Sequence, residues 1–249
     1  MNLSCSTLQN KRDYQEDRFF VDHLDENNSI FGVFDGHGGS DAADYASTRA
    51  AIIFRDLLLE NDFAGPAILG AVIQKLNSEL LPYESGTTAS LVHINTKHKF
   101  ADVAIIGDSP VIIKNDKDEI WIGPEHNVRS NKSEAAEAVL KGGVIIQGYL
   151  YDSYARDYGG LQMSRTLGDK YFSKVLNRNA EVFRIPLNKN SWVLCGTDGI
   201  LDPGHINNTT LTNDIVELIT IPSVVAEDII QVAINAGSFD NATAILARL

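Results

Sequence analysis

The sequence predicts a mixed α+β fold in which most strands pair antiparallel. Short segments rich in β-branched residues follow one another closely between residues 90 and 122, a spacing typical of antiparallel strands and not of βαβ units. Longer segments repeat apolar residues every three or four positions, which indicates helices that cover a sheet. No linker divides the 249 residues, so we expect a single domain over residues 1–249.

The chain is acidic, with a net charge of -12. This charge disfavours nonspecific binding to nucleic acid or to an anionic membrane surface. Cys5 and Cys195 show neither metal-ligand spacing nor a CxxC pair. The sequence shows no secretory signal and no apolar run that could span a bilayer. We therefore expect a cytoplasmic monomer, with a nuclear pool left open, that binds neither nucleic acid nor a membrane.

The first two predicted strands, residues 1–9 and 18–21, flank a charged loop. The loop is typical of a solvated hairpin connection, which is the simpler interpretation. The alternative is a binding site, in which the planar guanidinium of Arg12 pairs with an oxyanion and Glu16 or Asp17 binds a cation.

A short apolar run at residues 30–34 ends abruptly at Asp35, Gly36 and His37, and two more glycines follow. A buried strand that stops at an acid places a carboxylate at the end of a sheet, where sites tend to be built. Glycines allow backbone groups to approach a ligand closely. Asp35 could thus bind a metal with the Gly36 carbonyl, and His37 could move a proton. The alternative is an ordinary turn, because Asp-Gly and Gly-Gly are common turn dipeptides.

Helical periodicity indicates the segments that should cover the sheets. In the short third helix, Asn131 is expected to cap the first turn and Glu134 to bond back to the cap. Gly142 and Gly143 should end that helix. The expected helices comprise residues 40–61, 66–80, 131–141 and 224–236.

The remaining short apolar segments read as strands. The region 144–158 reads partly as a surface loop, either close to a substrate or without function. The expected strands after residue 85 comprise residues 90–94, 101–106, 111–114, 119–122, 192–196 and 242–246.

Acidic residues recur at the ends of the predicted strands, and Glu16 precedes one of them. Each acid alone is more typical of a turn, but the repetition indicates a shared site. Carboxylates packed together raise one another's pKa values, and divalent cations relieve this repulsion. Carboxylate and carbonyl oxygens favour Mg²⁺ or Mn²⁺ over Zn²⁺. The acids at strand ends are Asp35, Asp108, Asp198 and Asp240.

Taken together, these motifs resemble the metal-dependent PPM/PP2C family of protein serine/threonine phosphatases. They occur in the order typical of that family and cover nearly the whole chain. The resemblance implies two central antiparallel β-sheets packed as a sandwich with helices on both outer faces, a four-layer αββα arrangement. It rests on Arg12 with Glu16-Asp17, Asp35-Gly36-His37-Gly38-Gly39, Ser85-Gly86-Thr87-Thr88-Ala89, Gly107-Asp108-Ser109, Ser164-Arg165-Thr166-Leu167-Gly168-Asp169, Asp198-Gly199-Ile200-Leu201-Asp202 and Asp240-Asn241.

The resemblance also implies a site for two Mg²⁺ or Mn²⁺ ions. Asp35 would bridge both ions. Glu16 and the Gly36 carbonyl would serve one of them, and Asp198 and Asp240 the other. In the mechanism that this implies, a water activated by the metals attacks phosphorus in line, and no phosphoenzyme forms.

Four further positions match residues with roles in the family. Asp108 and Asp202, together with Asp198, match a weaker third metal site. Arg12 matches the arginine that binds phosphate. His37 matches the proposed general acid that protonates the leaving alkoxide. The implied substrate is a phosphorylated protein.

Two other functions stay open. One is a pseudophosphatase scaffold, although such proteins usually lose the metal-binding acids that are present here. The other is a phosphomonoesterase of this fold that acts on small molecules. The chain also departs from the family pattern at Pro110, where arginine is common, and in residues 126–160, which match the variable flap region poorly. This region therefore predicts no particular substrate.

Overall fold

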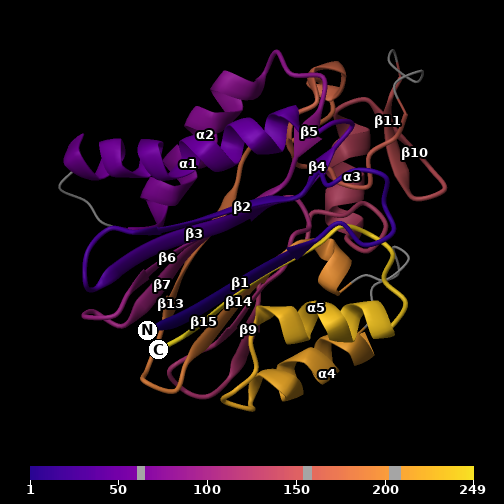
Figure 1. Ribbon diagram of the computed structural model, residues 1–249. Coiled ribbons are helices and arrows are strands. Elements are labelled where there is room, and N and C mark those ends of the chain that lie inside the picture. Colours follow the sequence, from indigo (N-terminus) through magenta and orange to yellow (C-terminus); the bar gives the residue numbers. More distant parts are fainter. Residues whose placement is uncertain (61–64, 154–158, 202–208) are drawn as a thin grey trace.

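The computed structural model describes residues 1–60, 65–153, 159–201 and 209–249. Two five-stranded antiparallel sheets lie face to face in the middle of the molecule (Figure 1). Sheet I contains, in spatial order, β1 (Asn2–Leu8), β15 (Ala242–Arg248), β14 (Trp192–Gly196), β8 (Val111–Lys114) and β9 (Ile120–Ile122). Sheet II contains β13 (Glu181–Pro186), β7 (Phe100–Ile106), β6 (Ala89–Asn95), β3 (Asn28–Phe34) and β2 (Arg18–His23).

Helices cover the outer face of each sheet, so the predicted four-layer αββα sandwich is confirmed (Figure 1). Sheet II packs against α1 (Asp41–Glu60) and α2 (Pro66–Leu80). Sheet I packs against α4 (Thr209–Ile219) and α5 (Ala226–Asn235). Within the described residues, no helix is long and apolar enough to cross a membrane.

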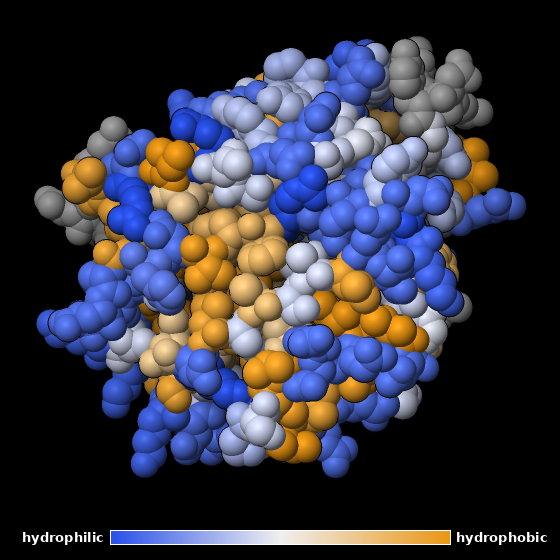
Figure 2. All heavy atoms as spheres, in the orientation of Figure 1, coloured by the Kyte–Doolittle hydropathy of each residue, from blue (hydrophilic) through white to orange (hydrophobic). Residues whose placement is uncertain are grey.

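The alternation of side chains along β3 shows why the chain forms layers. Ile30 and Phe34 face the α1 and α2 helices, whereas Phe31 and Val33 face sheet I. Because successive side chains of a strand point to opposite faces, a strand that is apolar at every position is buried on both sides. Figure 2 shows the molecule in the orientation of Figure 1. Apolar residues lie in the middle of this face, and polar residues surround them.

A smaller structural unit lies at one end of the sandwich (Figure 1). It contains a three-stranded sheet in the order β12, β5, β4, the helix α3, and a hairpin of β10 and β11. The bounds of these elements are β12 (Leu167–Gly168), β5 (Gly86–Thr87), β4 (Gly36–His37), α3 (Lys132–Leu140), β10 (Gly143–Ile146) and β11 (Tyr149–Asp152).

The structure corrects the prediction of a surface loop after residue 143. Residues 143–152 form a hairpin instead, and Gln147 and Gly148 make its turn with φ angles of 52° and 81°. Two positive φ angles suit the tight turns that connect twisted strands. The remainder of the predicted loop, residues 154–158, lies outside the described residues.

The predicted cap of α3 is only half confirmed. The Asn131 side chain accepts hydrogen bonds from the backbone N–H groups of Ser133 and Glu134, at 3.1 and 3.3 Å. The prediction that the Glu134 carboxylate bonds back to the cap is wrong, because this carboxylate binds the guanidinium of Arg165. A charged partner binds a carboxylate more strongly than a neutral backbone amide does.

The elements that were not predicted include the strand β13 and the helix α4. The strand β13 is an edge strand with alternating exposed side chains and a final proline, so its apolar signal is weak. The helix α4 was missed although Leu211, Ile215 and Ile219 recur at four-residue steps and are buried against sheet I. This four-residue spacing could have revealed the helix from the sequence.

Candidate active site

The predicted acidic residues converge on one pocket at the end of the sandwich. The pocket has a volume of about 550 Å³. Asp35 follows β3 of sheet II, and Asp198 follows β14 of sheet I. Strand ends from both sheets thus contribute carboxylates to the same space. The lining includes all the described candidate residues, namely Arg12, Glu16, Asp35, Gly36, His37, Asp108, Asp198 and Asp240; Asp202 lies outside the described residues.

Asp35 and Asp198 form the centre of this cluster, and their side chains share a hydrogen bond. Burial and the charges of neighbouring carboxylates, Asp198 foremost, raise the pKa of Asp35 well above 3.8. Burial and the charges of Asp108 and Asp240 raise the pKa of Asp198 in the same way. A shared proton is one way to relieve this repulsion, and a bound cation is another.

Asp17 belongs to the same cluster, although the sequence indicated it only as an alternative to Glu16. Its Oδ2 atom accepts hydrogen bonds from the hydroxyl groups of Thr197 and Thr243, both at 2.8 Å. Its Oδ1 atom is buried and has no hydrogen-bond partner among the residues that the structure describes. Burial and the charge of Asp240 raise the pKa of Asp17 to about 7. A buried carboxylate oxygen without a donor suits a cation or a water bound to one.

Gly36 allows two loops to pack closely at the pocket. A Cβ atom at this position would lie 2.5 Å from the backbone oxygen of Glu16. The Glu16 side chain in turn accepts a hydrogen bond from the backbone N–H of Gly39 at 2.6 Å. The glycine-rich turn therefore holds the Glu16 loop in place, which only a residue without a side chain permits.

Arg12 lies at the rim of the pocket and pairs with Asp240. The Nη2 atom of Arg12 is 2.6 Å from Asp240 Oδ2, and 41% of the Arg12 side chain is exposed. The structure thus brings the predicted phosphate-binding residue into contact with a predicted metal ligand. Because this pair is partly open to solvent, its partners can separate at little cost.

Asp108 is held by residues that the sequence did not indicate. Asn127 Nδ2 donates to Asp108 Oδ2 at 2.9 Å. Burial raises the pKa of Asp108 to about 6, although the Asn127 hydrogen bond favours the charged form. Gly107, with a φ angle of 104°, precedes the acid, and its N–H donates to His126 Nδ1 at 3.1 Å.

His37 faces the pocket from β4 and binds a further carboxylate, that of Asp169. The His37 Nε2 atom is 2.8 Å from Asp169 Oδ2. Burial disfavours the imidazolium, but the charge and the hydrogen bond of Asp169 outweigh it, so the pKa of His37 lies above its ordinary value of 6.5. Asp169 ends a motif that the sequence analysis singled out, but no function was predicted for it.

Comparison with known proteins agrees with this architecture. The family model described as "Protein phosphatase 2C" matches residues 1–242. The chain belongs to the protein phosphatase 2C family. The PP2C resemblance inferred from the motifs is therefore confirmed.

Relatives of this PP2C chain are named as phosphatases. It is 27% identical to "Probable protein phosphatase 2C 52" of Oryza sativa subsp. japonica, over 99% of this chain and 50% of the relative. It is 28% identical to "Protein phosphatase 1L" of Bos taurus, over 99% of this chain and 72% of the relative. The chain thus spans half the length of the rice relative. A further relative from Oryza sativa carries the word "mitochondrial" in its name.

Solved structures share the fold at lower sequence identity. A C. elegans sex determining protein superposes with a TM-score of 0.82 at 24% identity, covering 98% of this chain and 64% of that one. A serine-threonine phosphatase 2C from Toxoplasma gondii superposes with a TM-score of 0.75 at 17% identity, covering 98% and 93%. These similarities confirm the PP2C fold.

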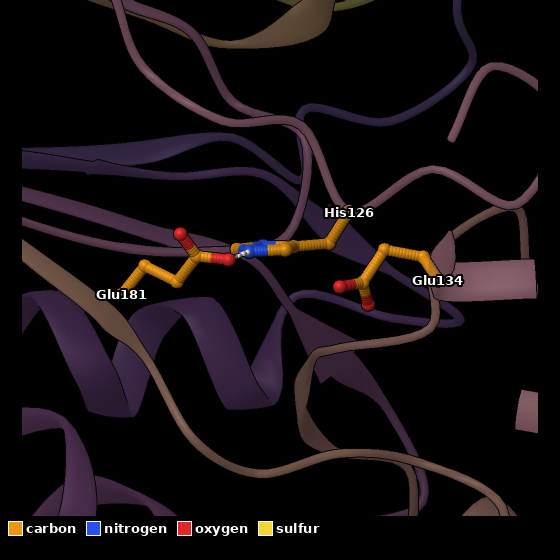
Figure 3. Close-up of side chains that lie close together, drawn as sticks. All are labelled: His126, Glu134 and Glu181. Atoms are coloured by element: carbon orange, nitrogen blue, oxygen red, sulfur yellow. Dashed lines mark hydrogen bonds and ion pairs between the residues drawn. The ribbon is translucent and has the colours of Figure 1, made fainter. Parts of the chain in front are cut away.

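A second cluster of potential metal ligands lies beside the pocket of this PP2C domain. It consists of His126, Glu134 and Glu181 (Figure 3). The guanidinium of Arg165 already pairs with both acids, at 2.6 Å from Glu134 and 3.4 Å from Glu181. His126 accepts the N–H of Gly107 at Nδ1, so its Nε2 carries the proton that points to Glu181. We interpret this cluster as an ion-pair network that joins α3 to β13.

Arg165→Met should lower the free energy of unfolding by about 3–5 kcal/mol, because breaking a buried ion pair leaves Glu134 charged and unpaired. Chemical denaturation of both proteins measures the change. Arg55→Met is the matched control, since Arg55 also makes two bonds to one carboxylate, of Asp22, but 46% of its side chain is exposed. The control should lose far less stability. Equal losses in the two variants would contradict a buried network around Arg165.

Proposed function

We propose that this chain hydrolyses phosphoserine and phosphothreonine in proteins, using a binuclear Mg²⁺ or Mn²⁺ centre and no phosphoenzyme. One observation carries the proposal. Carboxylates from both sheets meet in a single pocket, and burial together with mutual repulsion raises their pKa values. Membership of the PP2C family supports the same reaction.

The residues present fit a pair of hard divalent cations. The predicted ligand atoms at the pocket are carboxylate and carbonyl oxygens, and within the described part of the chain the buried Asp17 Oδ1 atom lacks a hydrogen-bond partner. We propose that Asp35 would serve both ions, Glu16 and the Gly36 carbonyl one of them, and Asp198 and Asp240 the other. Bound cations would relieve the repulsion between these carboxylates and lower the pKa of a water to near neutrality. Asp108 would contribute to a weaker third site together with Asp198 and Asp202.

The chain's own side chains supply the remaining functions. Arg12 would leave Asp240 and pair with phosphate oxygens as negative charge develops on them. His37 would protonate the departing serine or threonine oxygen, since an alkoxide is a poor leaving group. Cys195 is no nucleophile, because burial raises the pKa of its thiol to about 12.

We further propose that residues 1–249 form one catalytic domain. In support, β1 at the start of the chain pairs with β15 at its end. A monomeric state and a cytoplasmic or nuclear location stay predictions.

Phosphate release from a phosphothreonine peptide should occur with Mn²⁺ or Mg²⁺ and should stop when EDTA is added. Release of inorganic phosphate measures the reaction, and a panel of small phosphomonoesters run in parallel tests the alternative substrate class. Release from small esters alone would indicate a small-molecule phosphomonoesterase. No release with either metal would overturn the proposed reaction and favour the scaffold function.

A further inference from the structure

We propose that Asp169 is a positioning residue for His37, which it holds in the orientation of a general acid. The inference rests on the proposed function of the pocket and adds a residue to it.

The contact joins His37 to both oxygens of one carboxylate. His37 Nε2 lies 3.0 Å from Asp169 Oδ1 and 2.8 Å from Oδ2. Only 4% of the Asp169 side chain is exposed, against 24% for His37. A carboxylate is an acceptor only, so Nε2 carries the proton in this contact. Because the Asp169 carboxylate is shielded from water, its hydrogen bond with Nε2 holds the imidazole ring in one orientation.

Asp169 is itself held rigidly. Thr166 Oγ1 donates a hydrogen bond to its Oδ2 atom at 2.6 Å. The backbone N–H of Asp169 donates to the Ser85 oxygen at 3.1 Å, and the Phe172 N–H donates to the Asp169 oxygen at 2.9 Å. The residue adopts a left-handed conformation with φ 49°. These contacts come from local and distant segments, and they hold the backbone and the carboxylate of Asp169 in place beside His37.

Gly86 provides the space in which the two side chains meet. In the small sheet, His37 of β4 pairs with Gly86 of β5, and Gly86 pairs with Gly168 of β12. A Cβ atom on Gly86 would lie 2.0 Å from Asp169 Oδ2 and 2.3 Å from His37 Nε2. Any other residue at this position would therefore separate the pair. The sheet is built so that the contact passes directly over a glycine.

The contact leaves Nδ1 as the nitrogen that can exchange a proton. Among the described residues, buried Nδ1 has no hydrogen-bond partner, so it is free to bond to a water or to a substrate oxygen. When the phosphorus–oxygen bond breaks, the leaving oxygen would take the Nδ1 proton. The neutral imidazole then keeps its Nε2–H bond to Asp169 and regains a proton from water. Asp169 touches the ring and not the reacting atoms.

The experiment compares two leaving groups in wild type and Asp169→Asn, both with saturating Mn²⁺. The leaving group of a phosphothreonine peptide is an alkoxide, which needs a proton. The leaving group of p-nitrophenyl phosphate is a stable phenolate, which does not. We expect kcat to fall by about 10²-fold on the peptide and by less than about threefold on p-nitrophenyl phosphate. Adding Asp169→Asn to His37→Gln should not lower kcat on the peptide further, because the effects of substitutions at coupled residues are not additive.

Calorimetry measures Mn²⁺ affinity as a second readout besides activity. Asp169→Asn should bind Mn²⁺ with the same affinity as wild type. Asp22→Asn, on β2 and outside the pocket lining, is the matched control and should retain full activity. If Asp169→Asn does not fold, Thr166→Val tests the same geometry and should slow only the peptide, by about three- to tenfold. Equal loss on both substrates, or additive losses with His37→Gln, would overturn the role of Asp169. No release by wild type on either substrate would instead overturn the proposed function and this inference with it.

Discussion

Asp35→Asn should lower metal-dependent phosphate release by about 10³-fold or more, because it removes the negative charge that is proposed to bridge two cations. The substitution keeps the shape of the side chain, so the fold should persist. Rates with saturating Mn²⁺ and binding of Mn²⁺ by calorimetry measure the effect. Near-normal activity of the variant at saturating Mn²⁺ would show that the two-metal assignment is wrong.

The same variant should be more stable than wild type in EDTA. The pKa values of Asp17 and Asp108 are raised to about 7 and about 6, and those of Asp35 and Asp198 are raised as well. An acid with a raised pKa binds its proton more tightly in the folded state than in the unfolded state. Its contribution to stability is therefore largest below its ordinary pKa of 3.8 and is lost as pH rises through the folded value.

Thermal unfolding in EDTA at pH 6 and pH 8 checks this sign. The four carboxyl groups should make wild type lose stability as the pH rises, and Asp35→Asn should reduce that loss. With Mn²⁺ at pH 8 the order should reverse, because the cation stabilises the protein that binds it. Asp22→Asn is the control, because Asp22 pairs with the exposed Arg55. This variant should not change how stability depends on pH. A wild-type slope that is unaltered by Asp35→Asn would contradict a repulsive cluster.

His37→Gln should slow hydrolysis of a phosphothreonine peptide by about 10²- to 10⁴-fold, the usual contribution of a positioned acid. Hydrolysis of p-nitrophenyl phosphate should change little, because its phenolate needs no proton to leave. Initial rates on both substrates at saturating Mn²⁺ measure the difference. His98→Gln, at an exposed position, is the matched control and should leave both rates unchanged. Equal losses on the two substrates would argue that His37 organises the site without donating a proton.

The local patterns of the sequence predicted most strands of the two large sheets and most of the helices. The strand before Asp35 and the strand before Asp198 were both read from short apolar runs, and the structure confirms them as β3 and β14. The helix predicted over residues 66–80 is α2. These elements are predictable because burial imposes a period on side chains that lie close together in the chain. The edge strand β13 was missed since half of its side chains remain exposed.

The candidate site was predictable in part. An acid beside a glycine at the end of a strand is a local signal, and it placed Asp35, Asp108 and Asp198 among the candidates. Asp17 was left as an alternative to Glu16 because adjacent acids look equivalent in a sequence. In the structure, Asp17 points inward to two threonine hydroxyls, whereas Glu16 bonds to the glycine-rich turn.

By itself, the sequence determined the class of fold, the strand ends that carry acids, and the family to which the chain belongs. Only the tertiary structure decided which side chains are partners. Arg12 pairs with an acid 228 residues away, His37 with one 132 residues away, and Glu134 with Arg165 in place of its own helix cap. The reason is physical. Periodicity and turn chemistry act between neighbours in the chain, whereas charge and hydrogen bonding act between neighbours in space, which only the packing of the layers brings together.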